Sequence, residues 1–171
     1  MKSKAHNKYV TFKLGETRFG VAVLKTREIV EYGKITPVPE SPDYIEGVIN
    51  LRGSVVPVVN LSYKFFNRKS DIKESTSIMI VEPEIDGDRQ KMGLIVDLVS
   101  DVLEIKEELL EPPPKYGSKL KSEYLLNVAS IDEEFIMILD IDKVLSSIDV
   151  SGDFISSLEN KEKAASEKVE V

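Results

Sequence analysis

Short runs of Val, Ile, Leu, Tyr and Phe alternate along the chain with brief stretches of Gly, Pro and charged residues. Runs of this length, bounded by turn-forming residues, are typical of β-strands. They predict β-hairpins over residues 9–23, around the turn at Arg52 and Gly53, and over residues 77–97 and 124–141. Gly15 can adopt the positive φ that the first turn requires. Many short strands at this spacing predict a mainly β fold, either barrel or sandwich.

Helix is expected in only two short pieces, at about residues 25–31 and 141–147. After residue 150 the composition changes to Glu, Lys, Ala and Ser with few apolar residues. This composition predicts that residues 151–171 form a polar helix or a disordered tail.

An internal repeat is the most informative pattern in the sequence. A shift of 73 residues lays FGVAVLKTREIVE on MGLIVDLVSDVLE, and it aligns Gly20 with Gly93 and Glu28 with Asp101. A shift of 80 lays residues 44–65 on residues 124–145, and eleven of the twelve apolar positions in the first segment fall on apolar residues. The repeat predicts two similar β modules, at about residues 16–66 and 76–148, with the first strand completing either one.

Arg52 interrupts the apolar stretch from Gly47 to Leu61, and Asp132 takes its place in the second copy. Apolar positions recur because both cores need them, whereas nothing in a shared fold requires an arginine at this turn. Arg52 is therefore a candidate for a task of one copy alone, with a solvated turn charge as the alternative. Glu28 lies in the segment expected to pack beside this hairpin, and its carboxylate could hold the guanidinium through paired hydrogen bonds.

The charge and composition narrow the class of partner. A net charge of −7 disfavours binding to a phosphate backbone, so nucleic acid is not an expected partner. The chain has no cysteine, which excludes disulfides and thiol chemistry and suits a reducing compartment. No apolar run approaches the roughly 18 residues of a membrane span, and the first residues lack a signal-peptide pattern. We therefore expect a cytoplasmic protein that does not insert into the membrane.

Few residues suggest catalysis. No nucleophile-elbow, phosphate-loop or dinucleotide-binding motif occurs in the sequence. The best candidates for a metal site are Asp140 and Asp142, which a strand would place on one face, but no third ligand lies nearby in sequence. We therefore expect neither a metal nor another cofactor, and no enzymatic activity.

Several stretches together form a specific signature: YVTFKLGETRFGVAVLKTREI, ITPVPESPDYIEGVINLRG and VVPVVNL, followed by MGLIVDLVSDVL and EPPP. They resemble CheW, the coupling (adaptor) protein family of bacterial chemotaxis, over one domain of about residues 8–150. The resemblance implies two five-stranded SH3-like barrels that lie side by side. It also implies a non-enzymatic scaffold that links the cytoplasmic tips of methyl-accepting chemoreceptors to the regulatory domain of the chemotaxis histidine kinase, within membrane-associated arrays and with other adaptor copies in rings.

The resemblance also assigns residues to these partners. The positions that it implies for receptor binding are Arg52, Glu28, Thr26, Gly93, Val99 and Val102. Those that it implies for kinase binding are Ile29, Gly47, Lys115 and Tyr116. From the residues alone, core packing is an alternative for the two valines, and a bulge or close approach is an alternative for Gly93.

Three residues depart from the family pattern. Asn60 stands where aspartate is common, Thr26 where an apolar residue is usual, and Asn127 where glycine is common. Because Thr26 lies next to the expected partner surface, a diverged adaptor that serves another sensory system stays open. A third hypothesis is a small β-barrel enzyme that uses Glu28, Asp101 or Asp140 as acid–base groups, although no convergent nucleophile is visible.

Overall fold

The computed structural model describes residues 7–113 and 122–146. Their strands are β1 (Lys8–Leu14), β2 (Thr17–Ala22), β3 (Thr26–Glu31), β4 (Ile45–Leu51), β5 (Ser54–Asn60), β6 (Ser77–Val81), β7 (Glu84–Ile85), β8 (Asp88–Arg89), β9 (Met92–Val96), β10 (Leu98–Glu104), β11 (Leu110–Glu111), β12 (Leu125–Ile131) and β13 (Glu134–Leu139). Their helices are α1 (Leu61–Phe66), α2 (Ile141–Ser146) and three single 3₁₀ turns, η2 (Val23–Lys25), η3 (Glu107–Leu109) and η4 (Ser122–Tyr124).

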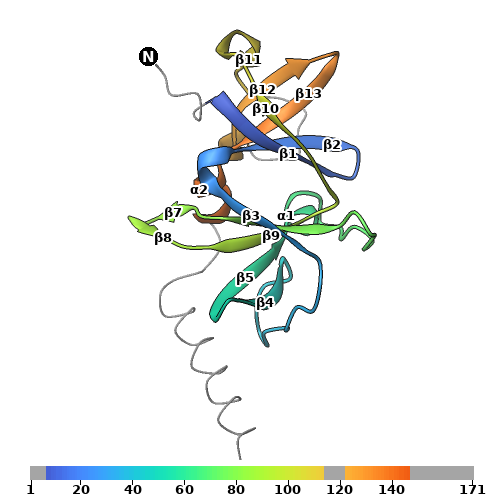
Figure 1. Ribbon diagram of the computed structural model, residues 1–171, viewed down its shortest axis with the longest axis vertical. Helices are drawn as coiled ribbons and strands as arrows, with labels where there is room; N and C mark the ends of the chain where they lie inside the picture. The colour runs from blue at the N-terminus through green and yellow to red at the C-terminus, as the bar shows by residue number, and fades with distance from the viewer. Residues whose placement is uncertain (1–6, 114–121, 147–171) are drawn as a thin grey trace, which may run out of the picture.

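The strands form two main sheets, which lie one above the other in Figure 1. The six-stranded sheet has the order β10-β1-β2-β13-β12-β11, and the five-stranded sheet has the order β3-β6-β9-β5-β4. The small hairpin β7–β8 projects from the side of the second sheet (Figure 1). The mainly β fold with two small barrels, expected from the sequence, is confirmed.

The two barrels exchange strands between the halves of the chain. Strand β1 of the first half pairs with β10 of the second, and β2 pairs with β13. In the other sheet, β6 and β9 of the second half join β3, β4 and β5 of the first. The sheets therefore do not follow the contiguous modules 16–66 and 76–148, because the chain crosses from one sheet to the other after β2 and again after β9. Corresponding strands nevertheless occupy the same order in both sheets.

The register of the sheets reproduces the sequence repeat. Gly20 pairs with Ile138 in one sheet, and Gly93 pairs with Val58 in the other, both in parallel pairs. These are the residues that the shifts of 73 and 80 align. The hairpins β4–β5 and β12–β13 also carry a register shift at equivalent places, after Ile45 and after Leu125. Equivalent side chains begin the two helices.

The side chains of Asn60 and Asp140 cap the first turns of α1 and α2. Asn60 Oδ1 accepts a hydrogen bond from Tyr63 N at 3.0 Å, and Asp140 Oδ1 accepts one from Lys143 N at 3.2 Å. Both satisfy an N–H group in the first turn of a helix, which has no partner within the helix. The departure of Asn60 from the family's aspartate therefore leaves this cap intact.

The buried side chains form three clusters. One fills the six-stranded barrel, and its members are Tyr9, Ile105, Ala129, Ile136 and Ile138. A second fills the five-stranded barrel, and its members are Val56, Val58, Ile78, Ile80 and Ile95. A larger third cluster lies between the sheets and draws on both, with Phe12, Phe19, Met79, Leu94, Phe65 and Leu139 among its members. The shared central core joins the two barrels into one unit.

The expected hairpins are present, but one expected helix is wrong. Residues 26–31 form strand β3, preceded by the 3₁₀ turn of residues 23–25. The alternating burial of TREIVE and its pairing with β6 explain the strand, since half-buried edge strands favour this period of two. The second helix was predicted correctly, at residues 141–146.

Candidate interaction site

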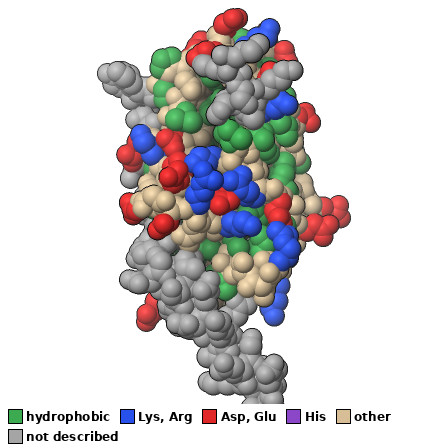
Figure 2. Space-filling model, turned by 60° about the vertical axis from the view of Figure 1, so that its left-hand side comes forward, with side chains coloured by type: hydrophobic (Ala, Val, Ile, Leu, Met, Phe, Trp, Pro, Cys, Tyr) green, Lys and Arg blue, Asp and Glu red, His purple; other side chains and the backbone are tan. Residues whose placement is uncertain are grey.

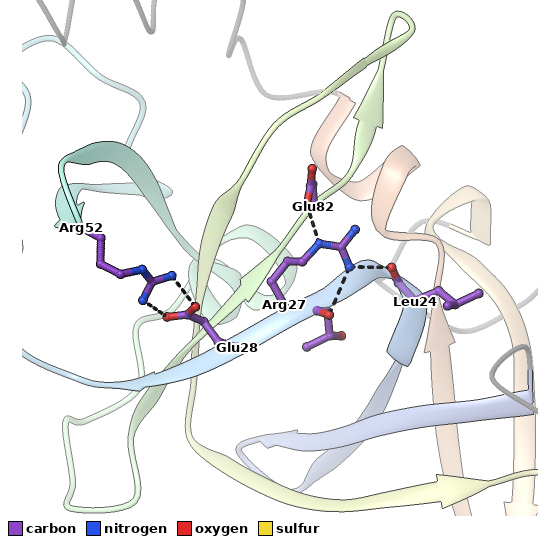
Figure 3. Close-up of polar contacts among 6 residues, drawn as sticks. Leu24, Arg27, Glu28, Arg52 and Glu82 are labelled. Carbon is purple, nitrogen blue, oxygen red and sulfur yellow. Dashed lines mark hydrogen bonds and ion pairs between the residues drawn. The ribbon is translucent and has the colours of Figure 1, made fainter.

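Arg52 and Glu28 form a two-point ion pair on the surface of the five-stranded barrel. Arg52 Nη1 donates to Glu28 Oε1 at 3.0 Å, and Nη2 donates to Glu28 Oε2 at 2.6 Å. Arg52 reaches from the β4–β5 turn toward Glu28 on β3, as Figure 3 shows. The paired hydrogen bonds fix the plane of the guanidinium while its side chain stays 66% exposed. The pairing of these two residues, expected from the sequence, is confirmed.

The pair changes the titration of both groups. The hydrogen bond from Arg52 lowers the pKa of Glu28 below its ordinary value, and partial desolvation opposes this effect. The same bond raises the pKa of Arg52. Both groups therefore stay charged across the physiological range, and the surface presents a fixed cation whose charge is partly balanced.

The turn that carries Arg52 is strained for this residue type. Arg52 and Gly53 have φ values of 51° and 88°, so both residues of the two-residue turn lie in the left-handed region. Turns of this kind favour Asn, Asp or Gly at the first position. Arginine is a poor choice for the turn itself, which favours a functional explanation over a local one.

A second ion pair lies beside the first and was missed from the sequence. Arg27 Nε pairs with Glu82, and its Nη1 donates to the backbone oxygen of Leu24 at 2.9 Å (Figure 3). Arg27 is the extra residue of a bulge, because Thr26 pairs with Val81 while Glu28 pairs with its neighbour. Bulges redirect side chains and often lie near functional sites. The charged segment KTRE was visible in the sequence, but nothing in it identified the partner of Arg27.

Basic and acidic side chains gather near the middle of one face of the molecule, with hydrophobic side chains close by (Figure 2). In the segment formed by η2 and β3, Leu24 and Ile29 are each nearly half exposed. Thr26 begins β3, and its hydroxyl donates to the backbone oxygen of Ala22 at 3.2 Å. Strand β3 thus presents both charge and apolar surface at a sheet edge.

Val99 and Val102 lie on β10, the edge strand of the other sheet. Val99 is partly buried and packs against the central core. Val102 is 57% exposed, and it pairs with Val10. The core alternative therefore fits Val99 in part, whereas Val102 is available to a partner.

Gly93 lies in the interior of the five-stranded barrel, and its expected part in receptor binding stays a prediction. It is buried in β9, and a β-carbon added there would lie 2.8 Å from Ile78 Cγ2 and 3.4 Å from Val58 Cγ2. Its repeat counterpart Gly20 faces Ile138 in the same way. Because the glycine recurs in both barrels, it serves interior packing, which is the close approach considered as the alternative.

Gly47 is also buried, and the backbone of Thr36 packs closely against it. Its φ is 148°, and an added β-carbon would lie 2.1 Å from the backbone oxygen of Thr36. The segment that bridges to Val48 covers it. Gly47 therefore cannot present its own surface to a kinase, whereas Ile29 on β3 is 45% exposed.

The other two residues expected to bind the kinase, Lys115 and Tyr116, lie outside the described residues.

The two aspartates considered as metal ligands, Asp140 and Asp142, do not lie on one strand face. Asp140 follows β13 and caps α2, while Asp142 lies within α2 and pairs with Lys25 at 3.1 Å. In residues 7–113 and 122–146 no cluster of three potential ligands is present. Among the residues that the structure describes, no helix is long and apolar enough to cross a membrane.

Taken together, the geometry defines a class of protein: two fused β-barrels with an oriented surface cation and exposed apolar edge strands. The family model described as the CheW-like domain matches residues 8–149. The chain belongs to this CheW-like family.

Individual relatives agree with that assignment. A chemotaxis protein CheW from Klebsiella aerogenes is 34% identical over 139 residues, which cover 81% of each chain. One from Thermotoga maritima is also 34% identical, covering 82% of this chain and 89% of the relative. The crystal structure of the scaffolding protein TtCheW from Thermoanaerobacter tengcongensis is 36% identical, with a TM-score of 0.73 over 85% of this chain and 90% of that one.

Proposed function

We propose that this protein is a non-enzymatic chemotaxis adaptor that couples methyl-accepting chemoreceptors to the regulatory domain of the chemotaxis histidine kinase. Relatives named as chemotaxis proteins, and a solved scaffolding protein that covers most of the chain, support the proposal. The observation that carries it is the Arg52–Glu28 pair, which holds an exposed cation at a turn where the repeat copy has Asp132.

The receptor tip docks on the surface around this pair. An oriented arginine gives direction and partner choice, while exposed apolar residues such as Val102 supply contact area for a helix face. Thr26 adjoins Glu28 on β3, and Val99 supports β10 from the core. Gly93 acts indirectly, by allowing the close packing beneath.

The kinase contacts the other expected surface. Ile29 provides an exposed apolar contact on β3, and Gly47 shapes the neighbouring barrel end through its tight approach to Thr36. Lys115 and Tyr116 form a second kinase contact that closes adaptors and kinases into rings. The protein acts in the cytoplasm and is recruited to membrane-associated receptor arrays.

One alternative keeps the kinase contact but replaces the receptor by a different sensory input. The polar Thr26 beside Glu28 favours it, because its hydroxyl is held by Ala22 and presents a less apolar surface than the family pattern. An enzymatic function has less support, since Glu28 is held by Arg52 and Asp140 caps a helix.

A reconstitution assay tests the proposal. Purified protein should co-sediment with receptor-containing membranes together with the kinase, and it should raise the rate of kinase autophosphorylation. Kinase binding without receptor binding would favour the alternative adaptor. Failure to bind either partner would reject both adaptor functions.

A further inference from the structure

Two crossovers connect the barrels, and each is fastened by one carboxylate. The first crossover is η2, which leads from β2 in the six-stranded sheet to β3 in the five-stranded sheet. The second is Asp97, which leads from β9 back to β10. The carboxylates are Asp142 at the first crossover and Asp97 at the second.

Asp142 joins three elements at the first crossover. Its Oδ2 lies 3.1 Å from Lys25 Nζ on η2, and its Oδ1 accepts a hydrogen bond from Glu84 N, at the start of β7, at 2.9 Å. Asp142 itself lies on α2. The side chains of Asp142 and Lys25 are about one-third exposed, so the pair is partly shielded from solvent. Both carboxylate oxygens are engaged.

Asp97 makes the corresponding connection at the second crossover, between β9 and β10. Its Oδ2 accepts hydrogen bonds from Gly15 N at 2.6 Å and from Ser70 Oγ at 3.0 Å. Ser70 in turn contacts Ser62 on α1, at 2.9 Å between the hydroxyl oxygens. Ser62 is the repeat counterpart of Asp142 under the shift of 80. The same three kinds of element therefore meet at both crossovers, namely a crossover, a hairpin and a helix region.

Only the first crossover leads directly to Arg52. The backbone oxygen of Lys25 accepts a hydrogen bond from Glu82 N at 2.8 Å, and the side chain of Glu82 pairs with Arg27 in the bulge. The next residue is Glu28, which holds Arg52. Asp142 is thus linked to the guanidinium of Arg52 through the contacts of Lys25, Glu82 and Glu28 and the peptide bond between Arg27 and Glu28.

We propose that Asp142 is a positioning residue for the Arg52–Glu28 pair: by fastening Lys25 and β7 to α2, it fixes where the bulge of β3 presents Glu28. Asp142 contacts neither member of the pair. It acts through Lys25 and Arg27. Asp97, at the opposite crossover, accepts hydrogen bonds from Gly15 and Ser70 instead, and it provides a control carboxylate that is not connected to Lys25.

The first test needs no partner. Asp142→Asn keeps an acceptor for Glu84 N but removes the ion pair with Lys25, and Lys25→Met removes the same ion pair from the other side. Both variants should raise the pKa of Glu28, measured by NMR of its side-chain carboxyl, toward the value in an Arg52→Ala protein. Asp97→Asn should leave the Glu28 pKa unchanged. An unchanged Glu28 pKa in both Asp142→Asn and Lys25→Met would overturn the proposal.

The second test rests on the proposed function and uses receptor-containing membranes as the probe. Asp142→Asn should weaken receptor binding about threefold to tenfold, and it should have no further effect in an Arg52→Ala background. Asp97→Asn should weaken binding equally in both backgrounds or not at all. An equal effect of Asp142→Asn in the two backgrounds would contradict positioning. If the wild type bound no receptor, the proposed function would fail, while the NMR test of Asp142 would still decide its role.

Discussion

Arg52 and Asp132 occupy the same turn position in two copies of one hairpin, with φ values of 51° and 50°. Aspartate is a favourable residue at such a position, and arginine is not. The backbone of the turn is therefore a property of the fold, whereas the arginine is an addition to it. The two hydrogen bonds from Arg52 to Glu28 hold the guanidinium in one orientation at the surface, which fits the proposed role in receptor binding.

Arg52→Asn should separate stability from function. The sequence Asn-Gly is among the best for this turn, and the exposed pair with Glu28 contributes little to folding. We expect the melting temperature to stay the same or to rise by about 2 °C, measured by calorimetry, while receptor binding is lost. A clear fall in melting temperature would show that the pair matters mainly for folding.

Three glycines should respond to alanine in a defined order. Gly47→Ala should be the most damaging, because its β-carbon would meet a backbone oxygen at 2.1 Å. Gly93→Ala should cost about 1–3 kcal/mol, since the 2.8 Å contact with Ile78 forces the core to shift. Gly20→Ala, with its nearest contact at 3.0 Å, should cost less than Gly93→Ala. Denaturant unfolding measures the series, and a neutral Gly93→Ala would contradict its assignment to the barrel interior.

The Glu28–Arg52 pair should persist to low pH. Because the folded-state pKa of Glu28 is lowered from 4.5, its contribution is present above that ordinary value and is lost as the pH falls through the folded-state value. The Glu28 carboxyl should therefore titrate below the usual glutamate range in the wild type and move upward in Arg52→Ala. NMR titration of both proteins measures this difference. Equal values in the two proteins would show that the pair does not form in solution.

The strand exchange predicts that the two halves of the chain depend on each other. Each barrel takes strands from both halves, and the central core also uses both. Fragments divided within the segment between α1 and β6 should each be unfolded alone and should fold when mixed, as measured by circular dichroism. Independent folding of either fragment would contradict the exchanged arrangement.

Much of the fold could be predicted because apolar residues recur at equivalent positions in the two copies of the repeat. The alignments of Gly20 with Gly93 and of residues 44–65 with 124–145 reappear as paired registers in the sheets. The same comparison singled out Arg52, since its counterpart in the second copy is Asp132. Glu28 was predicted as its partner because the segment TREIVE was expected to pack beside this hairpin.

Other features depend on contacts that sequence spacing does not encode. Residues 26–31 form a strand because β6 pairs with them, and Gly93 and Gly47 are buried by residues distant in the sequence. The exchange of strands between the halves was also not predictable, because a repeat gives the order of strands in each copy but not which copy they join. Asp142 was noticed for metal chemistry, and its contacts with Lys25 and Glu84 appeared only in the structure.

The most direct test of the adaptor account is the affinity of Arg52→Glu for its two partners. Binding to receptor-containing membranes and to the kinase regulatory domain would be measured side by side with the wild type. The account predicts that receptor affinity falls at least about tenfold while kinase affinity and melting temperature stay unchanged. Undiminished receptor binding by Arg52→Glu would contradict the central claim that this arginine is held for the receptor.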